Sequence, residues 1–161
     1  MHRWVNTPYV AEWWDPLPTL ADVSAKYGGR IDGNDPTRSF IVLSGAEPIG
    51  YIQTYRIADY PHYNEHVEAR AHAAGVDLFI GDAGHAGQGI GSIALRKFLR
   101  MIVFADESIA ECIIGPEPQN HRAIRSYEKA GLRYWKTIQV PGERAPEYLM
   151  RITRAELDNR A

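Results

Sequence analysis

The chain has 161 residues, of which 45% are apolar and 24% are charged, as expected for one globular domain with a sizeable buried core. Its formal net charge of −2 gives no reason to expect a nucleic-acid partner. The single cysteine, Cys112, excludes an intramolecular disulfide, and its apolar surroundings (AECIIG) favour an inert core thiol over a nucleophile. Because no signal peptide, long apolar run or lipidation motif occurs, we expect a single domain over residues 1–161 in the cytoplasm, without a membrane partner.

The beginning of the chain is predicted to be helical in two pieces. Residues 3–27 have a helical pattern that is interrupted at Asp15-Pro16-Leu17-Pro18, where the prolines end the first helix. Thr19 and Asp22 stand three residues apart, which is the spacing of a helix start in which side chains cap backbone N–H groups. The second helix is therefore expected to begin just after Thr19.

The next segments are predicted to be a β-hairpin and then a loop. Residues 39–43 and 48–57 have strand composition and flank the turn Gly45-Ala46-Glu47. Residues 58–73 show no apolar periodicity, so we expect a long loop, which in a compact domain is usually functional or mobile. We expect no metal site, because the histidines of this loop lack regular ligand spacing: His62, His66 and His72.

The rest of the chain alternates strands with helices. Strands are expected at residues 75–80, 109–114, 134–140 and 147–152, and helices at residues 90–104 and 120–130, the second closed by Gly131. This order predicts an α/β (α+β) fold in which a mixed central sheet is flanked by helices.

A glycine-rich turn precedes the helix predicted at residues 90–104. Gly87, Gly89 and Gly91 alternate with other residues and run directly into the helix, in the segment DAGHAGQGIGSIALRKFL. Such a turn directs backbone N–H groups toward one point, where the helix N-terminus adds about half a positive charge. Glycine lets a ligand approach the backbone closely. The sequence therefore predicts a phosphate site, the alternative being a flexible loop without a ligand.

The helix predicted at residues 120–130 carries a second pattern, NHRAIRSYEKAGL. Asn120, Ala123, Ile124 and Tyr127 are spaced i, i+3, i+4 and i+7, so they share one helix face. Together with the glycine turn, this helix resembles the acyl-CoA-binding half of the GNAT superfamily of N-acetyltransferases. That superfamily has a (Q/R)-x-x-G-x-(G/A) loop for pyrophosphate, whereas this chain has Ala86 at the first position and a histidine one place earlier.

The resemblance implies acetyl-CoA as cofactor and assigns residues to it. A backbone N–H at Leu78 or Phe79 would polarise the thioester carbonyl, on a strand that diverges from its neighbour. The turn, the helix after it and the helix at residues 120–130 would hold the rest of the cofactor, through His85, Gly87, Gly89, Ile90, Gly91, Ser92, Asn120 and Ala123. Tyr127 would point at the sulfur, where a phenol with a pKa near 10 can protonate a departing thiolate. The alternative for Tyr127 is a half-buried core aromatic, and Arg122 and Arg125 are either solvated charges or phosphate contacts.

Asp77 is the one charged residue in an apolar strand, GVDLFIG. A carboxylate in such a strand is costly to bury without a partner. Its presence is explained if it meets a cationic amine or acts as a base, with its pKa set by desolvation against that cation. The alternative is a carboxylate at the sheet edge that faces solvent.

Within the superfamily, nearly the whole chain resembles the aminoglycoside 6′-N-acetyltransferases, most clearly in VAEWWDPLPTLADVSAKY, GAEPIGYIQTY, GVDLFIG and NHRAIRSYEKAGL. The resemblance implies that Asp77 is the catalytic base and Tyr127 the acid, and that a polycationic amine is the partner, bound through Trp14, Tyr27, Gln53, Glu117 and Glu143. Its pocket should be acidic, and the candidate carboxylates are Asp15, Asp59, Glu65, Glu68, Asp77, Asp82, Glu117, Glu143 and Glu147.

The chain departs from that family at two places. Gly115 stands where the family has an acidic residue at the end of a strand, and Glu117 is the expected substitute. The family fold also opens with a strand, for which residues 1–3 leave no room. The alternatives are an N-acyltransferase of siderophore assembly, acetylation of a polyamine or a protein N-terminus, and a CoA-binding sensor without transfer activity. We expect a monomer or a weak homodimer.

Overall fold

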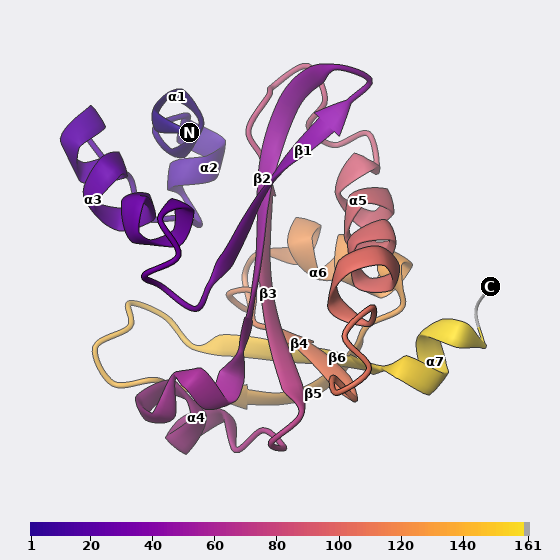
Figure 1. Cartoon of the computed structure of the whole chain (residues 1–161). Coiled ribbons are helices and arrows are strands. Elements are labelled where there is room, and N and C mark those ends of the chain that lie inside the picture. Colours follow the sequence, from indigo (N-terminus) through magenta and orange to yellow (C-terminus); the bar gives the residue numbers. More distant parts are fainter. Residues whose placement is uncertain (160–161) are drawn as a thin grey trace.

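The computed structural model describes residues 1–159, which form one six-stranded sheet with helices on both faces (Figure 1). The strands are β1 (Arg38–Ser44), β2 (Glu47–Arg56), β3 (Ala73–Ile80), β4 (Glu111–Ile114), β5 (Arg133–Ile138) and β6 (Glu147–Thr153). Their order across the sheet is β1-β2-β3-β4-β6-β5, and only β3 and β4 are parallel. The mixed sheet predicted from the sequence is confirmed, and within the described residues its first strand is β1.

Seven α-helices, one 3-10 segment and one π-helical segment complete the secondary structure of the described residues. They are α1 (His2–Val5), α2 (Pro8–Ala11), α3 (Leu20–Ile31), the 3-10 segment Ile57–Asp59, α4 (Pro61–Val67), α5 (Ile90–Phe98), the π-helical segment Leu99–Val103, α6 (His121–Ala130) and α7 (Arg154–Asp158). Figure 1 shows α5 and α6 on one side of the sheet and α1–α3 on the other. No helix of residues 1–159 has the length and apolar composition needed to cross a membrane.

Alternate side chains of β3 pack into two different cores, as the two-residue period of a strand requires. Ala74 and Val76 join the larger cluster, in which α5 and α6 contribute Leu95 and Tyr127. Ala73 faces the opposite way, into a smaller cluster with residues of β4, β6 and α4. The side chain of Asp77 is on the same face as Ala73, so it lies on the side of the sheet away from α5 and α6.

Several predicted elements are confirmed. The hairpin forms as β1 and β2, and α3 begins at a capping box in which Thr19 and Asp22 each accept a backbone N–H, at 3.1 and 2.9 Å. Gly131 ends α6 with φ of 109°, a left-handed conformation that glycine adopts without strain.

Two predictions about secondary structure are wrong. Residues 58–73 are not one long loop, because Pro61 starts the short helix α4, whose Val67 is fully buried against the sheet. A helix of seven residues spans only two turns, which is too short to show an apolar period. The first predicted helix, expected to reach the prolines at positions 16 and 18, is instead two short helices, α1 and α2, because Thr7 is extended before Pro8. The helix predicted from Ile90 to Phe104 forms, with π geometry from Leu99 to Val103, and α7 was not predicted.

Candidate functional site

Two cavities meet at Asp77. The larger, of about 710 Å³, lies between the glycine turn, β3 and the face of α6. The smaller, of about 380 Å³, lies between α3, β2, α4 and the segment before β6. The residues that line both are Trp13, Trp14, Asp77, Gly115 and Glu117. A group bound in one cavity can therefore reach a group bound in the other at the carboxylate of Asp77.

The larger cavity opens because β3 diverges from β4. The two strands pair only from Ala73 to Gly75, whereas β3 stays paired with β2 as far as Ile80. The N–H of Gly81 donates to the Ile49 carbonyl on the β2 side, at 2.8 Å. N–H groups alternate along a strand, so that of Leu78 faces the gap, whereas that of Phe79 faces β2. Of these two residues, Leu78 is therefore the one whose backbone N–H is directed into the gap.

The glycine turn presents a row of unpaired backbone donors. Gly87 and Gly89 both have φ of +80°, and Gly89 caps α5 without a side-chain hydrogen bond. Within residues 1–159, the N–H groups of residues 87–91 have no acceptor. The guanidinium of Arg122 lies 3.2 Å from the place of a Cβ on Gly87. Free N–H groups, a helix N-terminus and an arginine together fit a ligand that carries phosphates.

Tyr127 reaches the larger cavity from α6. This helix begins at Asn120, whose side-chain oxygen accepts the Ala123 N–H at 3.0 Å, and both residues also line the cavity. Tyr127 is only 8% exposed, and no group of the described residues hydrogen-bonds its phenol. Burial, and then the negative charge of Asp77, raise the pKa of Tyr127, so the phenol stays protonated at neutral pH.

Asp77 is held by a polar network that crosses two strands. Gln53 Nε2 donates to Asp77 Oδ2 at 2.8 Å, and Gln53 Oε1 accepts from Tyr51 at 2.8 Å and from Arg30 at 2.5 Å. Because two donors hold the amide oxygen, the amide NH₂ must face Asp77. Burial raises the pKa of Asp77, while the hydrogen bond from Gln53 and the charge of Arg30 oppose this rise.

The smaller cavity combines aromatic rings with acidic groups. Trp14 packs edge-on against Phe79 and Tyr51, with ring centroids 4.9 and 6.1 Å apart. Of the nine candidate carboxylates, five line this cavity: Asp15, Asp77, Glu117, Glu143 and Glu147. Glu117 is already paired with Arg144, at 2.6 Å. Carboxylates beside aromatic rings suit a ligand that carries several positive charges.

Comparison with known proteins agrees with this geometry. The model of the acetyltransferase (GNAT) domain matches residues 1–140. The chain belongs to the GNAT acetyltransferase family. It is 31% identical, over 88% of its length and 71% of the relative's, to an aminoglycoside N(6′)-acetyltransferase type 1 from Klebsiella pneumoniae. Its structure is similar to that of aminoglycoside acetyltransferase AAC(6′)-Ib in complex with coenzyme A, and to that enzyme with coenzyme A and kanamycin. Each match has a TM-score of 0.88 and 31% identity, and covers 99% of this chain and 91% of the other.

The GNAT fold brings most of the predicted site residues together. The expected cofactor residues Leu78, Phe79, Gly87, Gly89, Gly91, Ser92, Asn120 and Ala123 line the larger cavity, and the expected substrate residues Trp14, Gln53, Glu117 and Glu143 line the smaller one. Three predicted residues line neither cavity. His85 is bound to Asp82 at 2.7 Å, Tyr27 is buried behind Trp14, whose Nε1 donates to it at 3.1 Å, and Ile90 offers only its backbone N–H.

Sequence reasoning did not single out two residues that line the smaller cavity. Arg30 supports Gln53 from α3, and the sequence contains no local pattern that links these residues, which are 23 positions apart. Glu147 was only one of nine candidate acids, and its place beside Gly115 depends on the register of β6. A further cluster, His62, Glu65 and His66, gathers on α4 with ligand atoms within 4.8 Å of one another, and it does not include His72. It lies outside both cavities.

Replacing Gly89 by valine is expected to weaken acetyl-CoA binding by at least about tenfold, because the β-branched residue resists φ of +80° at the centre of the donor row. Isothermal titration with acetyl-CoA measures the dissociation constant. Gly33→Val is the matched control, since Gly33 has φ of +76°, no atom near its Cβ position and no place in either cavity. An unchanged affinity in Gly89→Val would remove the glycine turn from the cofactor site.

Proposed function

We propose that this chain transfers the acetyl group of acetyl-CoA to the 6′-amine of an aminoglycoside, with Asp77 as base and Tyr127 as acid. The observation that carries the proposal is the position of Asp77 in the wall shared by two chemically different cavities. One cavity has the donors and arginines that suit phosphates, and the other has the acids and aromatic rings that suit a polycation. The relatives named as aminoglycoside N(6′)-acetyltransferases support this choice of substrate.

The residues of the larger cavity fit acetyl-CoA. The N–H groups of residues 87–91, with Arg122, would hold its pyrophosphate, and Asn120 keeps its side-chain NH₂ free for an amide of the pantetheine arm. When bound, acetyl-CoA supplies an acetyl thioester. The N–H of Leu78, freed by the divergence of β3 from β4, would donate to the carbonyl oxygen, on which negative charge develops during acyl transfer.

Asp77 would take the proton that the amine must lose. Gln53 holds one carboxylate oxygen, so the carboxylate is fixed in orientation and its other oxygen can face the amine. Burial raises the pKa of Asp77 above that of an ordinary aspartate, which makes it a stronger base. The phenol of Tyr127, kept protonated by its raised pKa, would supply the proton that the leaving sulfur requires.

Thiol release from acetyl-CoA tests the proposed function. Purified protein is assayed with kanamycin, with an aminoglycoside that has a 6′-hydroxyl in place of the amine, and with spermidine and lysine. We expect turnover with kanamycin, a KM in the micromolar range, and no turnover with the 6′-hydroxyl analogue. Turnover confined to spermidine or lysine, or none with any amine despite binding of acetyl-CoA, would contradict the proposal.

A further inference from the structure

Glu147, at the start of β6, occupies space that Gly115 leaves open at the end of β4. A Cβ at position 115 would overlap Oε2 of Glu147 and would lie 3.0 Å from Cδ2 of Leu149. A side chain at position 115 is therefore incompatible with the present position of the Glu147 carboxylate. Because position 115 has no side chain, the Glu147 carboxylate can occupy this part of the cavity, which it enters from β6.

The Glu147 carboxylate is partly buried and has a single polar partner. Tyr63, on α4, donates its phenolic O–H to Glu147 Oε2 at 2.7 Å. Among the described residues, no lysine, arginine or histidine nitrogen lies within 4.0 Å of this carboxylate. The cationic side chains of the smaller cavity are engaged elsewhere: Lys26 with Asp15, Arg30 with Asp35 and Gln53, and Arg144 with Glu117.

In the surroundings of Glu147, the ionised carboxylate is unfavourable in free energy unless a cation lies beside it. Burial raises the pKa of Glu147 to about 7; the nearby charges of Asp77 and Glu143 add to the rise, and the hydrogen bond from Tyr63 opposes it. The rings of Tyr55, Tyr60 and Tyr63 line the same cavity. A buried acid among aromatic rings, without a cation from the protein, is the chemistry that recognises an ammonium group.

We propose that Glu147, oriented by Tyr63, binds a second ammonium group of the substrate, distinct from the amine that faces Asp77. The substrate class is thus a compound with at least two amines that span the smaller cavity. This inference rests on the proposed function for the identity of the first amine. It assigns Glu147 to substrate affinity and Asp77 to proton transfer.

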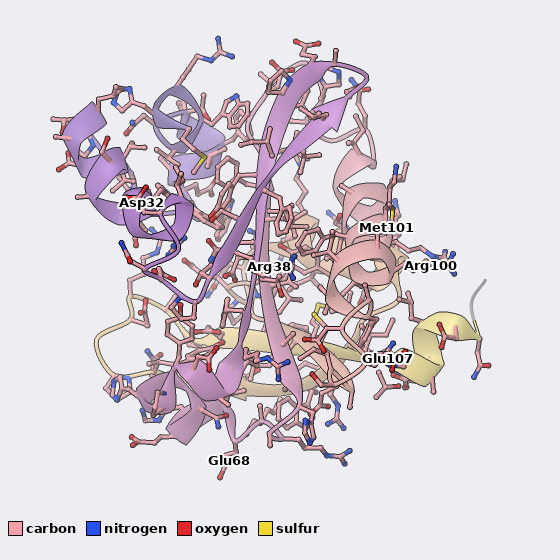
Figure 2. The ribbon with its side chains drawn as sticks, in the orientation of Figure 1. Asp32, Arg38, Glu68, Arg100, Met101 and Glu107 are labelled. Carbon is pink, nitrogen blue, oxygen red and sulfur yellow. The ribbon has the colours of Figure 1, made fainter. Side chains whose placement is uncertain are left out.

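Binding of kanamycin to the complex of the protein with coenzyme A, measured by calorimetry, tests the inference without turnover. Glu147→Gln keeps the shape and the acceptor for Tyr63 but removes the charge, so we expect a dissociation constant raised about 10- to 100-fold. In the assay, KM for kanamycin should rise by the same factor while kcat changes less than about threefold. Affinity for coenzyme A should not change. Glu107→Gln is the matched control, because Glu107 is on an exposed loop (labelled in Figure 2) and lines neither cavity.

A relocation variant separates loss of charge from damage to the fold. In Gly115→Asp with Glu147→Ala, the new carboxylate lies in the space that Glu147 vacated, and we expect kanamycin affinity to recover most of the loss seen in Glu147→Ala alone. Unchanged kanamycin affinity in Glu147→Gln would overturn the inference, and so would absence of kanamycin binding to the wild type. Kanamycin that binds through Glu147 but is never acetylated would instead overturn the proposed function alone.

Discussion

Asp77→Asn is expected to lower kcat by about 10²- to 10⁴-fold, the usual contribution of a positioned general base. The amide oxygen can still accept the hydrogen bond from Gln53, so the variant loses a proton acceptor and little structure. Affinity for acetyl-CoA should stay within about twofold. Steady-state kinetics with kanamycin and calorimetry with acetyl-CoA measure the two quantities. Asp32→Asn, on an exposed residue at the end of α3 (Figure 2), is the control for loss of a carboxylate.

Asp77→Asn should also change how the stability of the protein depends on pH, and the direction of this change follows from the pKa of Asp77. The folded protein holds the Asp77 proton more tightly than the unfolded chain does, because burial raises the pKa. The wild type therefore loses stability as pH rises from about 4, the ordinary aspartate value, through the raised pKa, and Asp77→Asn does not. As pH rises through this range, the melting temperature of Asp77→Asn should increase relative to that of the wild type. Full activity together with an unchanged difference in melting temperature would show that Asp77 is a solvent-facing carboxylate.

Tyr127→Phe is expected to lower kcat by about 10- to 1000-fold, because it removes the proton donor for the leaving sulfur and leaves the packing of the ring intact. The ring contacts the larger core, so the variant should fold and bind acetyl-CoA as the wild type does. Tyr134→Phe is the matched control, since Tyr134 is 52% exposed and lines neither cavity. Wild-type turnover in Tyr127→Phe would assign Tyr127 to the core alone.

The features that sequence alone predicted best are those built from neighbouring residues. The cap of α3, the left-handed Gly131 and the shared face of α6 each depend on residues less than about ten positions apart, so local patterns reveal them. The family resemblance added the placement of the glycine turn against α6. Asp77 stood out because a charge in an apolar strand is costly, whatever the fold around it.

The partners of the site residues could not be predicted in the same way. Tyr63 and Glu147 are 84 positions apart, and Tyr63 lies on a helix too short to show a period. Gln53 faces Asp77 only because β2 and β3 pair in a register that places these two residues opposite each other. The absence of a side chain at Gly115 was visible in the sequence, but the residue that fills the space depends on the register between β4 and β6.

The wall that the two cavities share also constrains the order of events. If the cavities bind their ligands as proposed, both reactants must be present in a ternary complex, in which the acetyl group passes directly from one ligand to the other. Cys112, the one thiol of the chain, is fully buried, and burial raises its pKa, so it cannot carry an acetyl group between two half-reactions. The protein would then bind its two ligands side by side, and both products must dissociate before the next acetyl-CoA and amine can bind.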